Sequence, residues 1–180
     1  NKPLIILDRP NPNGDYIDGP MLEKGFTSFV GLHPIPTVHG LTVGELAQMI
    51  NGEGWLKDGV KADIQVIELE NWDHSMPYGL PIKPSPNLPN DLSIRLYPSL
   101  CFFEGTDISL GRGTYFPFQV YGAPDEKYGD FTFTPKSIQG MSKNPPHENK
   151  VCYGTDLRDE SLDHRFTLEY LLEMYEKSGK

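Results

Sequence analysis

The densest group of chemically capable side chains lies in the run Phe103-Glu-Gly-Thr-Asp-Ile-Ser-Leu-Gly-Arg-Gly-Thr114. Glu104 directly follows an apolar stretch, and a carboxyl group in such a position can serve as a general acid. Glycines on both sides of Arg112 allow its guanidinium group to approach a ligand closely. The pattern favours a ligand site, although an ion pair between Glu104 and Arg112 that only braces the glycine loop would use the same residues.

A second polar group follows the first apolar run, in the segment Asp8-Arg-Pro-Asn-Pro-Asn-Gly14. Asp8, Arg9, Asn11 and Asn13 are interleaved with prolines, so they form a preset array of hydrogen-bond donors and acceptors. Such an array suits a polyhydroxylated ligand. An equally good interpretation is structural, with an Asp8–Arg9 ion pair and asparagines that cap turns.

Two further candidates stand alone. His39 lies just before a predicted helix N-terminus, where an anion is stabilised, although an isolated histidine is more often structural. Asn87 follows Lys83-Pro-Ser-Pro, and the prolines predict a rigid backbone and favour a structural role. The glycine spacing does not match a phosphate-binding loop, and no cysteine has a metal-like neighbour. We therefore expect no cofactor and no metal.

The elements that must position these residues can be predicted from apolar patterns. The run from Pro3 to Asp8 is typical of a parallel strand buried on both faces, and Asp63–Leu69 of a second strand. The capping box Thr42-Val-Gly-Glu45 predicts a helix that ends near Asn51. Open α/β sheets bind ligands at the carboxyl ends of their strands, which is where the Asp8 segment lies.

The second half of the chain is predicted to be irregular over residues 76–90. The apolar spacing in Asp91–Phe103 favours a helix over a strand, although Pro98 restricts it. We predict strands over Phe116–Tyr121, Asp130–Thr134 and Val151–Tyr153, and a helix over Leu162–Lys177.

Composition excludes some functions. The chain has 180 residues and a net charge of −9, with no run of lysine and arginine, so we expect no nucleic-acid partner. Its apolar stretches are too short to span a membrane, and it contains no signal peptide. Cys101 and Cys152 leave both a disulfide and two free thiols open.

Taken together, the motifs resemble the bacterial exo-β-N-acetylmuramidase family over residues 4–175. The motifs are Ile6-Leu-Asp-Arg-Pro-Asn-Pro-Asn-Gly14, Ser28-Phe-Val-Gly31, Pro34-Ile-Pro-Thr-Val-His-Gly-Leu-Thr-Val-Gly-Glu-Leu-Ala47, Pro84-Ser-Pro-Asn87 and the run from Glu104 to Thr114. Their common order makes the resemblance more specific than any single motif.

The resemblance implies an α/β protein in two parts. Residues 1–75 would be the end of a Rossmann-like domain with a parallel sheet, and residues 76–180 a smaller, loop-rich, mixed α/β subdomain. Such proteins release N-acetylmuramic acid from peptidoglycan fragments, usually outside the cytoplasm. The family's leading catalytic candidate is a glutamate in a Glu-His-Gly motif upstream of the first motif here, and this chain lacks that motif. His39-Gly40 cannot replace it, because Val38 stands where the glutamate would be. We therefore expect the missing amino-terminal half to be a partner, and this chain alone to be inactive.

The resemblance also gives the candidate residues roles in a glycoside hydrolase. Glu104 would be the catalytic carboxylate of this half, and Arg112 would pair with the lactyl carboxylate of muramic acid. The other predicted substrate-binding residues are Asp8, Arg9, Asn11, Asn13, His39, Asn87, Thr106, Ser109 and Thr114. His74 stands where the family more often has arginine. The alternative function is a non-catalytic module that binds cell-wall sugars.

Overall fold

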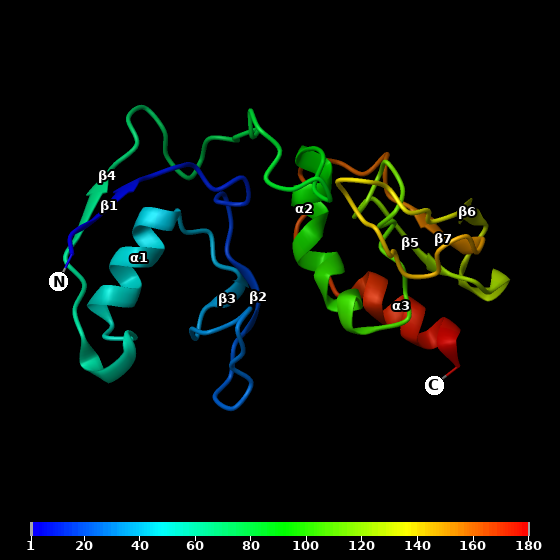
Figure 1. Cartoon of the computed structure of the whole chain (residues 1–180), viewed down its shortest axis with the longest axis horizontal. Coiled ribbons are helices and arrows are strands. Elements are labelled where there is room, and N and C mark those ends of the chain that lie inside the picture. Colours follow the sequence, from blue (N-terminus) through cyan, green and yellow to red (C-terminus); the bar gives the residue numbers. More distant parts are fainter. Residues whose placement is uncertain (1, 180) are drawn as a thin grey trace. The chain divides into compact units, whose positions relative to one another are not determined.

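The computed structural model of the chain describes residues 2–179 (Figure 1). Contacts divide it into two compact units, one extending to Tyr78 and the other beginning at Gly79. It contains a parallel strand pair, two antiparallel sheets and three α-helices, so the predicted mixed α/β class is confirmed. Within residues 2–179, every helix is too short or too polar to cross a membrane.

A parallel strand pair and one helix organise the first unit. Strands β1 (Leu4–Leu7) and β4 (Ile64–Ile67) form where the apolar runs predicted strands, and they pair in parallel. Helix α1 (Val43–Gly52) begins at the predicted capping box, in which Thr42 and Glu45 exchange hydrogen bonds. The helix lies so close to the strands that a Cβ atom on Gly44 would be 2.6 Å from Val66 Cγ1.

The predicted burial of β1 on both faces is wrong for this chain. Leu4, Ile5 and Leu7 are each more than half exposed, because β4 is the only strand beside β1 within residues 2–179. The first unit also has an antiparallel pair that the sequence did not indicate, formed by β2 (Asp18–Met21) and β3 (Pro36–Val38). Both strands contain proline, which masks a strand pattern.

The second unit is a three-stranded antiparallel sheet with helices packed against it. The sheet order is β5–β7–β6, where β5 is Val120–Ala123, β6 is Phe131–Phe133 and β7 is Cys152–Asp156. Its helices are α2 (Asp91–Leu100) and α3 (Glu169–Ser178). Short 3₁₀ turns lie at Cys101–Gly105 and Glu126–Tyr128, and the first unit has another at Lys57–Gly59. The main core consists of Leu96, Leu100, Phe103, Leu110, Phe118, Tyr121, Leu157 and Met174.

Helix α2 forms as the apolar spacing favoured, with Pro98 inside it, because Asn90 and Ser93 form a second capping box. The predicted strand over Phe116–Tyr121 is only partly right. Phe118 has a left-handed backbone, with φ of 57°, and donates its N–H to Leu110 O, so the strand begins at Val120.

The predicted helix over Leu162–Lys177 begins seven residues too early, because α3 starts at Glu169. The Thr167 N–H bonds the Ser99 hydroxyl on α2 instead of a carbonyl of its own segment. Residues before the helix are therefore held by a tertiary contact. Cys101 and Cys152 are both free thiols, and burial raises the pKa of each to about 11.

The contact between β5 and β7 requires glycine on both strands. Gly122 lies opposite Gly154, and a Cβ atom on Gly154 would clash with the Tyr121 carbonyl oxygen. We expect Gly154→Ala to lower the free energy of unfolding by about 2–4 kcal/mol, because backbone atoms cannot move aside cheaply. Urea denaturation measures the change.

Gly105→Ala is the matched control, since an added Cβ there meets open space in the same unit. If both alanine variants unfold at the wild-type urea concentration, the close approach of β5 and β7 does not constrain the fold.

Candidate functional site

The Asp8 carboxylate binds the N-terminus of helix α1. It accepts hydrogen bonds from the Thr42 hydroxyl at 2.7 Å, the Gly44 N–H at 2.8 Å and the Arg9 N–H at 2.9 Å. Partial burial acts to raise the pKa of Asp8, but these hydrogen bonds outweigh it and lower the pKa below its ordinary value. Asp8 therefore ties β1 to α1, while the Arg9 side chain is exposed.

The asparagines and His39 hold the loop beside the same helix end. The Asn11 side chain donates to Leu41 O at 3.0 Å and accepts from the Asn13 N–H at 2.9 Å. His39 Nδ1 accepts from the Leu41 N–H at 3.0 Å. Burial lowers the pKa of His39, which favours the neutral ring. Because Nδ1 accepts this hydrogen bond, a neutral His39 holds its proton on Nε2. The structure thus brings Asp8, Asn11, Asn13 and His39 into one network.

His74 joins this network through Glu45, a contact that the sequence did not predict. Its Nε2 lies 2.9 Å from Glu45 Oε1, and its Nδ1 lies 2.9 Å from Gly14 O. Both partners are acceptors, so the doubly protonated ring can donate to both, whereas the neutral ring can donate to only one of them. The hydrogen bond from Glu45 raises the pKa of His74, although partial burial opposes it. The only sequence signal for a role of His74 was that the family more often has arginine at this position.

In the second unit, Glu104 and Arg112 form an ion pair. Nη2 and Nε of Arg112 lie 2.5 Å and 3.2 Å from the same oxygen, Glu104 Oε1. The guanidinium carbon lies 4.9 Å from the centre of the Phe118 ring, which restrains the plane of the guanidinium group. About a third of each side chain is exposed, 39% for Glu104 and 30% for Arg112. The pair is therefore accessible to a ligand, unlike a buried brace.

The predicted hydroxyl residues form hydrogen bonds with the backbone. Thr106 Oγ1 donates to Phe103 O at 2.8 Å, and Thr114 Oγ1 donates to Gly111 O at 2.6 Å. Ser109 is fully buried, and its hydroxyl accepts from the Gly111 N–H. These residues stabilise the glycine loop, so their role as sugar ligands stays a prediction.

Asn87 is held in the same way, since its amide donates to Met141 O at 3.2 Å. Its Oδ1 atom is buried without a hydrogen-bond partner among residues 2–179. The same residues contain no group of three or more histidine, cysteine or acidic side chains that could hold a metal ion.

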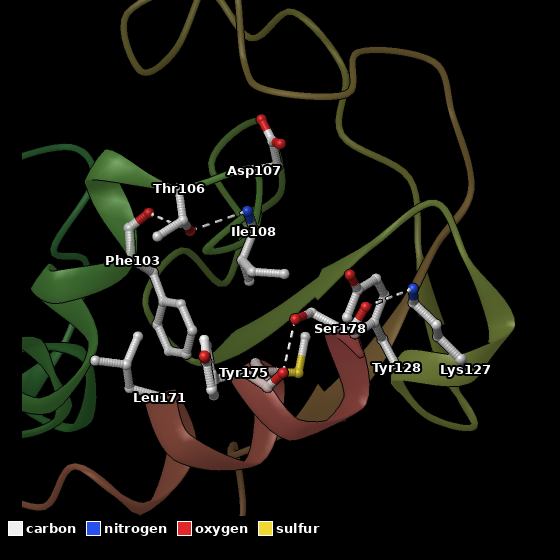
Figure 2. Close-up of a pocket in the computed structure, with 10 residues that line it drawn as sticks. Phe103, Thr106, Asp107, Ile108, Lys127, Tyr128, Leu171, Tyr175 and Ser178 are labelled. Carbon is white, nitrogen blue, oxygen red and sulfur yellow. Dashed lines mark hydrogen bonds between the residues drawn. The ribbon is translucent and has the colours of Figure 1, made fainter. Parts of the chain in front are cut away.

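A pocket of about 370 Å³ in the second unit includes Thr106 in its wall (Figure 2). Phe103 and Leu171 supply apolar surface, and Lys127 lies near the end of α3. Neither Glu104 nor Arg112 lines this pocket. Several of its polar groups already bind the protein, since the Thr106 and Ser178 hydroxyls donate to backbone carbonyls and Lys127 pairs with Asp125. The pocket therefore leaves few hydrogen bonds for a polyhydroxylated ligand.

Comparison with known proteins gives two family matches along the chain. Residues 1–92 match the model described as "Exo-beta-N-acetylmuramidase NamZ, N-terminal", and residues 95–177 match "Exo-beta-N-acetylmuramidase NamZ, C-terminal". The peptidoglycan beta-N-acetylmuramidase NamZ of Bacillus subtilis (strain 168) is 40% identical. That match covers 86% of this chain and 40% of the relative.

Two crystal structures of DUF1343 family proteins from Bacteroides fragilis NCTC 9343 are similar over 98% of this chain. One has a TM-score of 0.94 with 52% identity, and the other a TM-score of 0.80 with 25% identity. The alignments cover 51% and 50% of those chains, respectively. The chain thus spans about half the length of these structures, and less of the Bacillus protein.

The His74–Glu45 pair predicts a pH-dependent contribution to stability. Because its pKa is raised, His74 contributes fully below its ordinary value of 6.5 and loses the contribution as the pH rises through the raised value. Glu45 has a lowered pKa, so the pair persists down to about pH 4.5. We expect His74→Gln to cost less than about 1 kcal/mol at pH 5.5, because both side chains are 40% or more exposed, and almost nothing at pH 9.

Urea midpoints of wild type and variant at the two pH values measure this effect. His39→Gln is a control of opposite sign, since burial lowers the pKa of His39 and its contribution grows as the pH rises. A cost of His74→Gln that is larger at pH 9 than at pH 5.5 would contradict a raised pKa of His74 in the folded protein.

Proposed function

Because the chain belongs to the NamZ family of exo-β-N-acetylmuramidases, we propose that the intact protein is a peptidoglycan-processing glycoside hydrolase. It releases terminal N-acetylmuramic acid, and this chain contributes part of the substrate site. The observation that carries the proposal is the pair of family matches, which together extend over nearly the whole chain. The name of the Bacillus relative supports the same substrate and reaction.

On the same ground we propose that the protein acts outside the cytoplasm, where peptidoglycan is found. An exported enzyme would act on fragments during turnover or recycling of the cell wall. The rest of the protein would supply the remainder of the substrate site as part of a Rossmann-like domain.

Glu104 is the catalytic residue that we propose for this half. Glu104 forms an ion pair with Arg112, and a carboxylate in such a pair can act as a base or stabilise positive charge. Glycoside hydrolysis passes through a cationic, oxocarbenium-like transition state and needs a carboxylate as base, nucleophile or stabiliser. The geometry therefore favours this role for Glu104 over the general acid that its position in the sequence suggested.

Arg112 is the residue that we propose for recognition of the lactyl carboxylate. It directs Nε and Nη2 to one oxygen of Glu104, and its other N–H groups remain for a second carboxylate. Phe118 holds the guanidinium plane, so little side-chain entropy is lost when a ligand binds.

The polar residues of the first unit have a positioning role in this proposal. Asp8, Asn11, Asn13 and His39 are engaged with the backbone around α1, so they fix the loop on which the exposed Arg9 stands. Arg9 then supplies a cation for sugar hydroxyl or carboxylate groups.

Glu104→Gln tests the catalytic role. We expect kcat for release of N-acetylmuramic acid by the intact protein to fall about 10²- to 10⁴-fold with KM little changed, because the amide keeps the shape but carries no charge. The rate is measured on a soluble peptidoglycan disaccharide, with circular dichroism to verify the fold.

Asp156→Asn is the matched control, since Asp156 forms the corresponding acid–arginine pair with Arg158 elsewhere in the unit. An unchanged rate in Glu104→Gln would remove Glu104 from catalysis. Binding of the disaccharide by the intact wild-type protein without turnover would instead favour the sugar-binding module.

A further inference from the structure

A second pocket of about 370 Å³ is lined by Gly113–Phe116, the four residues that follow Arg112 in the sequence, and by residues between Thr132 and Ile138. One part of its lining is aromatic, from Tyr115, Phe116 and Phe133. The rest includes four residues with aliphatic hydroxyl groups, Thr114, Thr132, Thr134 and Ser137, together with Lys136. Neither the family matches nor the proposed function assigns a role to this pocket.

Tyr115 is an exposed aromatic ring on a rigid backbone. Its side chain is 81% exposed, so packing in the core does not explain the residue. Just before it, the Gly113 carbonyl accepts from the Lys136 N–H at 2.8 Å, and Gly113 has φ of 83° with no room for a Cβ atom against Lys136 O. The Thr114 hydroxyl donates to Gly111 O and accepts from the Phe116 N–H, so it holds the backbone on both sides.

This rigidity has a consequence for binding. A ring whose backbone is already ordered loses little conformational entropy when a ligand stacks on it. The flat, apolar face of a tyrosine matches the C–H face of a pyranose ring, and the phenol hydroxyl can bond to the sugar's edge. Tyr115 is therefore suited to act as a stacking platform.

Three of the hydroxyl groups in this pocket differ from those of the glycine loop, to which the fourth, Thr114, belongs. Thr106, Ser109 and Thr114 use their hydroxyls on the backbone. By contrast, the hydroxyls of Thr132, Thr134 and Ser137 have no hydrogen-bond partner among the described residues. Each free hydroxyl can donate one hydrogen bond and accept another, which is what a sugar with several hydroxyl groups requires.

Lys136 adds a positive charge to the pocket. Its ammonium group forms no ion pair within residues 2–179, and it differs from Lys83, Lys143 and Lys150, the other lysines of the unit without an ion pair among those residues, because it lines this pocket. An unpaired cation in a chain of net charge −9 favours a ligand that carries a carboxylate.

We propose that this pocket is a sugar-binding subsite for an amino sugar that bears a carboxylate, with Tyr115 as its stacking platform and Lys136 as the partner of the carboxylate. The choice of N-acetylmuramic acid as that sugar rests on the proposed function. This subsite is a second sugar site, additional to the one that the proposed function gives to Arg112, because neither Glu104 nor Arg112 lines it.

The experiment titrates the chain with N-acetylmuramic acid and, separately, with N-acetylglucosamine, which lacks the carboxylate. Binding is followed by two-dimensional NMR, and we expect dissociation constants of about 1–10 mM, with shifts centred on residues of this pocket. Tyr115→Ala should weaken binding of both sugars at least about tenfold, whereas Tyr115→Phe keeps the ring face and should change it less than about twofold. Lys136→Gln should reduce the affinity for N-acetylmuramic acid to that for N-acetylglucosamine.

Tyr175→Ala is the matched control, because Tyr175 is an exposed tyrosine of the same unit that lines the other pocket. The proposal is overturned if the wild type binds neither sugar at about 50 mM or if Tyr115→Ala binds like the wild type. It is also overturned if the shifts centre on the pocket that Thr106 lines or on Arg112 alone, and not on the Tyr115 pocket. Hydrolysis by the intact protein is measured separately. Hydrolysis without binding at this pocket refutes only the subsite, and binding without hydrolysis refutes only the proposed enzyme.

Discussion

Long loops leave many backbone N–H and C=O groups without partners in a helix or strand, and each buried group must still be paired. In the first unit, Asp8, Asn11 and Thr42 supply these partners around the N-terminus of α1. In the second unit, the hydroxyls of Ser109 and Thr114 do the same for the glycine loop. Much of the polarity of the motifs therefore holds the fold, and only the remaining polar groups are available to a ligand.

The remaining groups are few and chemically coherent. The Glu104–Arg112 pair offers a carboxylate and a guanidinium group in a partly exposed position on the Phe118 ring. Three residues after Arg112, Tyr115 is exposed on a backbone that hydrogen bonds of the neighbouring residues keep rigid. An acidic sugar needs a cation, an apolar face and hydroxyl partners, and these are the groups that the second unit leaves free.

Local patterns predicted elements whose cause is local. The capping box places the start of α1 at Thr42, and alternating or continuous apolar runs place β1, β4 and β6. Elements that depend on contacts distant in sequence were missed or misplaced. The pairing of β2 with β3 is hidden by prolines, and the Ser99 contact with Thr167 delays the start of α3.

The sequence by itself determined the family, the mixed α/β class and the candidate residues, because each depends on residue types in a fixed order along the chain. Only the tertiary structure decided which candidates form hydrogen bonds within the protein. A hydroxyl or amide bonds to whichever polar group folding brings within about 3 Å, and that group is then not available to a ligand. The tertiary structure also paired His74 with Glu45, residues that are neighbours in space but not in sequence. Likewise, the ion pair between Glu104 and Arg112 exists because folding brings the two side chains together.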